Sequence, residues 1–195
     1  MSKAVLISIR PKWCEKIASG EKTIEVRKTR PKLDTPFKCY IYCTLQGCNE
    51  FFRVDLGGDV AKWNRGKWWD RKGKVIGEFV CRGFIPFCKA RPCFVMEAPE
   101  EIERMACLTR KEIWKYAPEG NPIGWRISDL LIYDAPRELS EFWRSCPEYS
   151  ELSTNCLVCE NVCGDSDETD CNTDGRIYLR RAPQSWCYVE EVRDE

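Results

Sequence analysis

The sequence predicts an α+β fold, a small and mostly antiparallel β-barrel of about six strands with inserted helices. Three observations predict it: short strand-like runs between turn residues, amphipathic helical segments between the runs, and a length of 195 residues. That length fits one domain with room for a large insertion. Hydrophobic residues make up 43% of the chain and charged residues 32%, as in a folded protein.

The N-terminal elements come in the order strand, helix, strand. The run from Lys3 to Ile9 is apolar and β-branched, which is typical of a buried strand. Pro11 suits the first position of a helix, which we expect to reach about Ser19 and to end at Gly20. The apolar face of this helix consists of Trp13, Cys14, Ile17 and Ala18.

Further elements follow along the chain. We expect strands over residues 39–45, 74–84, 124–133 and 186–192, with Gly77 and Gly83 marking bends or bulges in the second of them. Helices are expected over residues 97–106 and 109–116, and a short helical piece over 138–143. Thr109 and Glu112 have the spacing of a capping box, which predicts the start of the second helix.

The segment from Ser19 to Lys28 carries the most informative charges. In a strand, Ile24 and Val26 share one face, while Thr23, Glu25 and Arg27 share the other. Lys22 lies at the strand entrance, just outside this alternation. The alternative to a functional site is a solvated face of an edge strand, with one weak ion pair.

The charges are distributed unevenly, although the formal net charge is zero. Residues 1–38 carry ten basic and four acidic side chains, a net charge of +6. Residues 146–175 carry eight acidic side chains and no basic one, a net charge of −8. The basic part suits an anionic partner such as a nucleic acid, which the acidic segment would oppose. The sequence pI near 6.4 argues against strong non-specific binding to DNA.

Two function classes are excluded by composition. The chain contains no histidine, so acid–base chemistry by His is excluded. No apolar run approaches the length of a membrane span, and Ala4 to Ile9 is too short for the core of a signal peptide. We therefore expect a cytoplasmic protein that does not bind a membrane.

Several motifs, in this order, resemble the ASCH-domain family, a branch of the PUA-like β-barrels, of the type common in Firmicutes and phage genomes. The similarity runs from Lys3 to about Glu190, except for the acidic cysteine segment. The motifs that carry it are Ile9–Trp13, Gly20–Lys28, the strand that begins at Gly73, Trp125–Leu130, Ile132–Pro136, Leu139–Phe142 and Arg181–Tyr188.

The resemblance implies a PUA-like barrel with a cleft where the first helix meets the second strand, and a cleft that binds RNA or a modified nucleotide. We expect Lys22, Glu25 and Arg27 to contact the ligand. Further candidates for the same cleft, as phosphate contacts or hydrogen-bonding groups, are Lys12, Lys16, Glu78 and Ser128. No organic cofactor is expected.

Two other functions stay open. Some small ASCH proteins are amidohydrolases of acetylated cytidine that use a Lys and a Thr of this element, and these two positions correspond to Lys22 and Glu25 here. If the chain is a hydrolase of a modified nucleoside or RNA, Glu25 would act as a general base on water with Lys22 beside it. In the third possibility the acidic segment binds an unknown protein partner.

Fourteen cysteines are a high number for a protein without a secretory signal, so we expect reduced thiols. The acidic segment carries a Cys-x-x-Cys pair and is too poor in apolar residues to order itself without a metal. A structural zinc would be held by Cys146, Cys156, Cys159 and Cys171, with Cys163 as an alternate. The alternative is a disordered acidic loop with incidental cysteines.

The separation of the acidic cysteine segment from the rest of the chain predicts an insertion over residues 145–185 within a barrel formed by residues 1–144 and 186–195. The other nine cysteines are expected in the core.

The adjacent pair Trp68 and Trp69 allows at most one ring to stack on a base, because neighbouring strand residues point to opposite faces.

Overall fold

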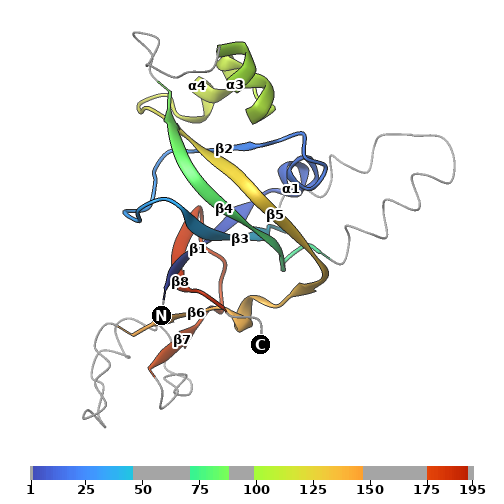
Figure 1. Ribbon diagram of the computed structural model, residues 1–195, viewed down its shortest axis with the longest axis vertical. Helices are drawn as coiled ribbons and strands as arrows, with labels where there is room; N and C mark the ends of the chain where they lie inside the picture. Colours follow the sequence, from blue (N-terminus) through green and yellow to red (C-terminus); the bar gives the residue numbers. More distant parts are fainter. Residues whose placement is uncertain (1, 46–70, 88–98, 147–174, 193–195) are drawn as a thin grey trace, which may run out of the picture.

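The fold is built on a curled six-stranded sheet, as shown by a computed structural model that describes residues 2–45, 71–87, 99–146 and 175–192 (Figure 1). The strand order is β2-β5-β4-β3-β1-β8, with β1 and β3 parallel and the other neighbours antiparallel. The predicted α+β class with a mostly antiparallel, barrel-like sheet is confirmed. The strands are β1 (Lys3–Ile9), β2 (Ile24–Arg27), β3 (Phe37–Cys43), β4 (Val75–Pro86), β5 (Ile123–Arg137) and β8 (Trp186–Glu190).

Three α-helices lie in the described residues: α1 (Pro11–Ala18), α3 (Pro99–Ala106) and α4 (Arg110–Tyr116). Helices α3 and α4 cover the end of the sheet that carries β2 (Figure 1). The predicted capping box is confirmed, since Glu112 N donates to Thr109 Oγ1 and Thr109 N donates to Glu112. The expected helical piece near residue 138 is a single 3₁₀ turn, Leu139–Glu141.

A second, two-stranded sheet was not expected from the sequence. It pairs β6 (Trp143–Ser145) with β7 (Arg176–Tyr178) and lies at the opposite end of the molecule from α3 and α4 (Figure 1). These strands flank residues 147–174, which lie outside the described residues. Cys146 N also donates to Gly175 O at 2.9 Å, so this ladder lies within the predicted insertion and brings together the residues on either side of 147–174.

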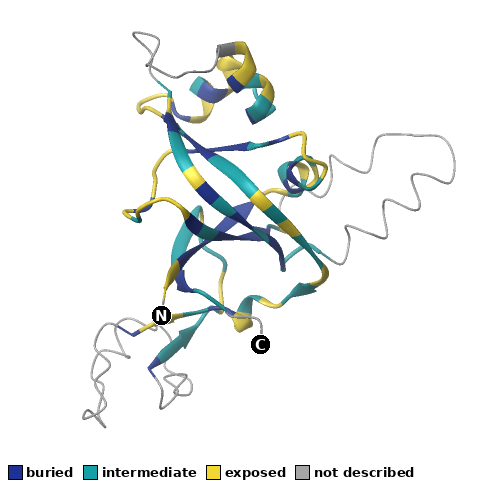
Figure 2. Ribbon diagram, viewed as in Figure 1, coloured by how far each residue is buried: buried dark blue, intermediate teal, exposed yellow. Residues whose placement is uncertain are grey.

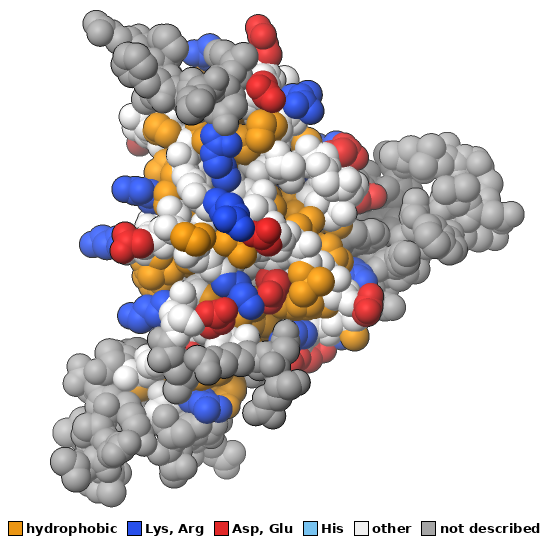
Figure 3. Space-filling model, viewed as in Figure 1, with side chains coloured by type: hydrophobic (Ala, Val, Ile, Leu, Met, Phe, Trp, Pro, Cys, Tyr) orange, Lys and Arg blue, Asp and Glu red, His pale blue; other side chains and the backbone are white. Residues whose placement is uncertain are grey.

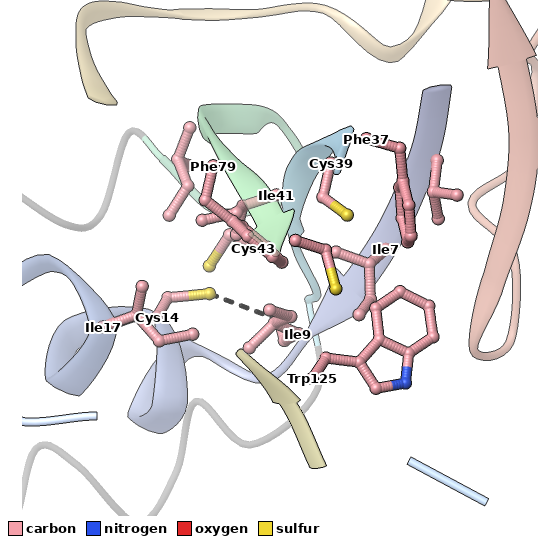
Figure 4. Packing of buried hydrophobic residues seen from close by; sticks show 13 residues of the cluster. Ile7, Ile9, Cys14, Ile17, Phe37, Cys39, Ile41, Cys43, Phe79 and Trp125 are labelled. Carbon is pink, nitrogen blue, oxygen red and sulfur yellow. Dashed lines mark hydrogen bonds between the residues drawn. The ribbon is translucent and has the colours of Figure 1, made fainter. Parts of the chain in front are cut away.

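Both faces of the main sheet are buried along β1, β2 and β3, whereas most of β5 is half-buried or exposed (Figure 2). One face packs under α1, where Ile7, Ile9 and Trp125 of the sheet lie together with Cys14 of the helix (Figure 4). The opposite face of β1 and β3 packs Leu6 and Tyr40 against Phe142. The core location expected for Cys14, Cys39, Cys43 and Cys81 is confirmed, whereas Cys107 and Cys187 are half-buried.

Candidate functional site

Strand β2 is an edge strand, yet both of its faces are buried. Ile24 and Val26 pack with Ile85, Ile102 and Ile113, residues of β4, α3 and α4. The other face turns inward beside Trp125, the direct cross-strand partner of Glu25. The predicted alternation along the strand is therefore confirmed.

The charged side chains of this face form one buried cluster, which we call the β2 cluster: Lys22, Glu25 and Arg27. These residues are only 2%, 6% and 7% exposed. The alternative of a solvated face with a weak surface ion pair is therefore wrong. Charges are buried this deeply only when they are paired, because removing them from water is unfavourable.

Glu25 lies between the two cations of the β2 cluster. Its Oε2 lies 3.4 Å from Lys22 Nζ, and its Oε1 lies 3.1 Å from Arg27 Nε. The second contact is an ion pair without hydrogen-bond alignment, since Arg27 Nε makes no hydrogen bond. The guanidinium instead donates through Nη2 to the carbonyl oxygen of Ser8 at 2.5 Å. Arg27 thereby links the edge strand β2 to β1, across the open side of the sheet.

The ammonium of Lys22 contacts the C-terminal end of α3. Lys22 Nζ donates to Ala106 O at 2.6 Å, and Thr23 N donates to Met105 O at 2.9 Å. Carbonyl groups in the last turn of a helix have no partner within the helix and carry partial negative charge. The entrance of β2 thus supplies the donors that the end of α3 lacks.

The end of α3 has the geometry of a Schellman motif. Cys107 N donates to Arg104 O and Leu108 N donates to Glu103 O, each at 3.1 Å. Cys107 occupies the left-handed position with φ of 51°, where glycine is the usual residue. This turn leaves the carbonyl of Ala106 free to accept from Lys22.

An aromatic ring completes the surroundings of Lys22. Its ammonium lies 5.0 Å from the ring centroid of Trp13, and Lys12 Nζ lies 4.9 Å from the same centroid. Burial lowers the pKa of Lys22, an effect that the carboxylate of Glu25 partly opposes. All three directions of the ammonium therefore face a partner: a carbonyl, a carboxylate or a π-face.

The remaining predicted ligand residues divide into two groups. Lys12 and Lys16 both lie on α1, close to the β2 cluster. Lys12 is exposed beside Trp13, and Lys16 Nζ lies 2.8 Å from Glu21 Oε2. Glu78 and Ser128 are not part of it. Ser128 Oγ donates to Val80 O at 2.9 Å within the β4–β5 ladder.

Glu78 belongs to a separate polar network on the opposite face of the sheet. It is the cross-strand partner of Tyr40 and accepts from the hydroxyl of Tyr133 at 2.7 Å. Lys38 Nζ lies 2.9 Å from its other oxygen. Burial and this carboxylate both raise the pKa of Tyr133.

Two partners of the β2 cluster, the backbone carbonyls of Ser8 and Ala106, could not be predicted from the sequence. The side chain of Ser8 takes no part in the cluster, because its Oγ donates to Pro183 O at 2.6 Å. Every residue has a backbone carbonyl, so residue identity does not show which carbonyl will be a partner. Only the placement of β1 and α3 reveals it. Trp13, predicted for the core, packs against it and also faces the cations.

The predicted zinc site lies almost entirely outside the described residues. Cys146 is buried and described, whereas Cys156, Cys159, Cys163 and Cys171 are not within the described ranges, and neither are Trp68 and Trp69. Among the residues that the structure describes, no group of three His, Cys, Asp or Glu side chains is placed to hold a metal ion. None of the described helices has the length and apolar character needed to cross a membrane.

Comparisons with known proteins give similarity to solved structures only. The chain is similar to ASCH from Zymomonas mobilis, with a TM-score of 0.46 and 15% identity over 91% of this chain and 88% of that one. It is also similar to a serine-to-alanine mutant of ZmASCH from the same organism, with a TM-score of 0.47 and 18% identity over 70% of this chain and 74% of that one. No family model and no curated protein matches the sequence.

Proposed function

We propose that this chain is an ASCH-type protein that binds RNA or a modified nucleotide at the β2 cluster and the adjoining surface of α1. The motif order from Lys3 to about Glu190 supports the family. The observation that carries the binding proposal is the excess of positive charge: Lys22 and Arg27 share the single carboxylate of Glu25. Lys12 adds a further, exposed cation next to the ring of Trp13. The two cations of the cluster are buried and paired, so their net positive charge would act through the electric field, which attracts a phosphate group to the exposed surface around Lys12.

The contacts of Glu25 argue against hydrolysis. A general base on water needs a carboxylate oxygen that can accept a proton from the water. Each oxygen of Glu25 instead faces a cation, and Lys22 donates to Ala106 O. The pair that the hydrolase alternative requires is therefore occupied by interactions that hold β2, α3 and β1 together.

The test is the melting temperature of the protein with a panel of nucleosides, nucleotides and short RNAs, because a ligand that binds the folded state raises its stability. We expect nucleotides to raise the melting temperature and nucleosides to raise it less. Lys12→Ala should reduce the shift, since this side chain is exposed and its loss leaves the fold intact. Lys3→Ala is the matched control, because Lys3 is also exposed but lies on β1.

Two results would select the other functions. Release of product from acylated nucleosides, lost in Lys22→Ala and Glu25→Ala, would establish the hydrolase. Failure of every nucleotide and RNA to bind at any salt concentration would favour a protein-interaction module.

We also propose that residues 145–185 form an insertion stabilised by zinc, on the grounds of the Cys-x-x-Cys pair and the low apolar content of the segment. The β6–β7 ladder brings Cys146 next to Gly175, and so brings together the chain on either side of residues 147–174. Elemental analysis of fresh protein should give about one zinc per chain; less than about half an equivalent would contradict the proposal.

A further inference from the structure

A row of aromatic rings runs from the core to the surface next to the β2 cluster. Trp125 is fully buried, and its ring centroid lies 5.8 Å from Phe84 and 6.0 Å from Trp186. Tyr188 follows, 5.4 Å from Trp186. Phe84, Trp186 and Tyr188 are only half-buried; we call these three the aromatic row. Half-buried aromatic rings of this kind are the platforms on which unpaired bases stack.

The rings of the aromatic row are held in place by the chain between β2 and β3. Trp186 Nε1 donates to Thr29 Oγ1 at 3.1 Å, and Lys32 N donates to the hydroxyl of Tyr188 at 2.8 Å. A ring fixed by a hydrogen bond loses less conformational entropy when a ligand stacks on it. The platform is therefore organised before a ligand arrives.

The same chain segment is basic and exposed. Lys28, Arg30 and Lys32 are all exposed within five residues. Arg30 lies over the ring of Phe84, with 5.2 Å from the guanidinium carbon to the centroid. In Figure 3 basic side chains protrude along the left edge, where the chain between β2 and β3 lies in Figure 1. Aromatic rings interleaved with cations match the alternation of bases and phosphates in a nucleic acid strand.

The aromatic row is continuous with the β2 cluster. Arg27 donates to Ser8 O, and Ser8 in turn contacts the start of β8, since Ser8 N donates to Ser185 O at 2.9 Å. Trp186 follows directly in the sequence. On the other side, Lys28 follows Arg27. The aromatic row and the β2 cluster are therefore neighbours in the fold.

We propose that the aromatic row, with Lys28, Arg30 and Lys32, binds single-stranded nucleic acid by base stacking and phosphate contacts. This extends the proposed function from one nucleotide to a strand. Duplexes do not fit this chemistry, because their bases are stacked within the helix and unavailable to the rings.

The decisive experiment measures fluorescence anisotropy of labelled 12-nucleotide poly(U) and poly(A) RNA across 50 to 300 mM salt. The test variant is Arg30→Ala with Lys32→Ala, which removes exposed side chains and leaves the rings in place. Loss of two phosphate contacts should lower the slope of log K against log salt by about 1.4 and weaken binding about 20-fold at 0.1 M salt. Lys3→Ala with Lys111→Ala is the matched control, since both lysines are exposed on β1 and α4.

Stacking is tested separately with Trp186→Leu. The variant and wild type are each measured at the same number of degrees below their own melting temperature. We expect weaker binding of both RNAs with an unchanged salt slope, because a stacking contact carries no charge. Single-stranded DNA of the same length shows whether the 2′-hydroxyl matters; binding of either strand supports the proposal. Equal affinity in Arg30→Ala/Lys32→Ala and wild type, or equal competition by duplex RNA, would overturn it.

Failure of this inference can be told apart from failure of the proposed function. If the melting temperature rises with nucleotides but Arg30→Ala/Lys32→Ala binds RNA normally, the β2 cluster binds the ligand and the aromatic row does not. If nucleotides have no effect but RNA binding depends on Arg30 and Lys32, the surface site stands and the β2 cluster is structural.

Discussion

The ammonium of Lys22 lies 2.6 Å from the carbonyl oxygen of Ala106, and this contact joins the start of strand β2 to the end of helix α3. The same ammonium pairs with Glu25, which in turn pairs with Arg27. Because Arg27 donates to Ser8 O, one chain of charges connects α3, β2 and β1. The predictions below test what this chain contributes and how the backbone around it is constrained.

Glu25→Gln should destabilise the protein by about 3 to 5 kcal/mol, because it leaves two buried cations without a counter-ion. The measurement is the free energy of unfolding in urea at pH 7. A variant with Lys22→Met, Glu25→Leu and Arg27→Met should be more stable than Glu25→Gln, since no uncompensated charge remains. A loss below about 1 kcal/mol in Glu25→Gln would show that water reaches the cluster freely.

Lys22 should make stability depend on pH in alkaline solution. Burial lowers its pKa in the folded state below the ordinary value of 10.5, so the unfolded chain binds more protons between the two values. The free energy of unfolding of wild type should therefore rise, relative to that of Lys22→Met, as pH increases toward 10.5. The comparison with Lys22→Met removes the contribution of groups that do not interact with Lys22. A difference that stays constant with pH would contradict the assignment.

Two glycines of β4 should differ in how far alanine destabilises the protein. A Cβ on Gly77 would collide with the backbone oxygen of Leu131, so Gly77→Ala should cost about 3 kcal/mol or more. At Gly83 the nearest atom is Arg126 Cδ at 3.9 Å, so Gly83→Ala should change stability by less than about 0.5 kcal/mol. Urea unfolding of the two single variants checks the contrast, and equal effects would refute the close approach of β4 to β5 at Gly77.

Cys107→Gly should stabilise the protein by about 0.5 to 1 kcal/mol, because Cys107 holds φ of 51° at the end of α3 and glycine adopts that backbone without strain. Its thiol donates only a long contact of 3.4 Å to Glu21 O. Cys107→Ala is the control, since it keeps the Cβ and should give no gain. Thermal unfolding in the presence of reductant measures both, and a loss in Cys107→Gly would mean that the thiol contributes more than the backbone strain removes.

The parts of the fold that depend on local sequence were predicted well. Pro11 at the start of α1 and the Thr109–Glu112 capping box at α4 act within one helical turn, and both are confirmed. The alternation of Ile24 and Val26 with Glu25 and Arg27 is likewise a property of any extended strand.

Elements that depend on distant partners were not predicted. Strands β6 and β7 have three residues each and exist only because they pair across a long segment of chain. Nor did the sequence show on which face of the sheet Glu78 lies. Ile76 and Phe79 both face the α1 side although they are three residues apart, because the β3–β4 register shifts between Ile41 and Tyr42 and leaves Ile76 as an extra residue in β4.

By itself, the sequence determined the class of the fold, the order of its elements and the presence of a lysine, a carboxylate and a guanidinium at the start of the second strand. Only the tertiary structure decided that these charges are buried. Their burial depends on α3, which covers β2 and presents the carbonyl of Ala106, and on the curl of the sheet that brings Ser8 to Arg27. Both partners are backbone oxygens placed by long-range packing, and no residue pattern encodes where such atoms will lie.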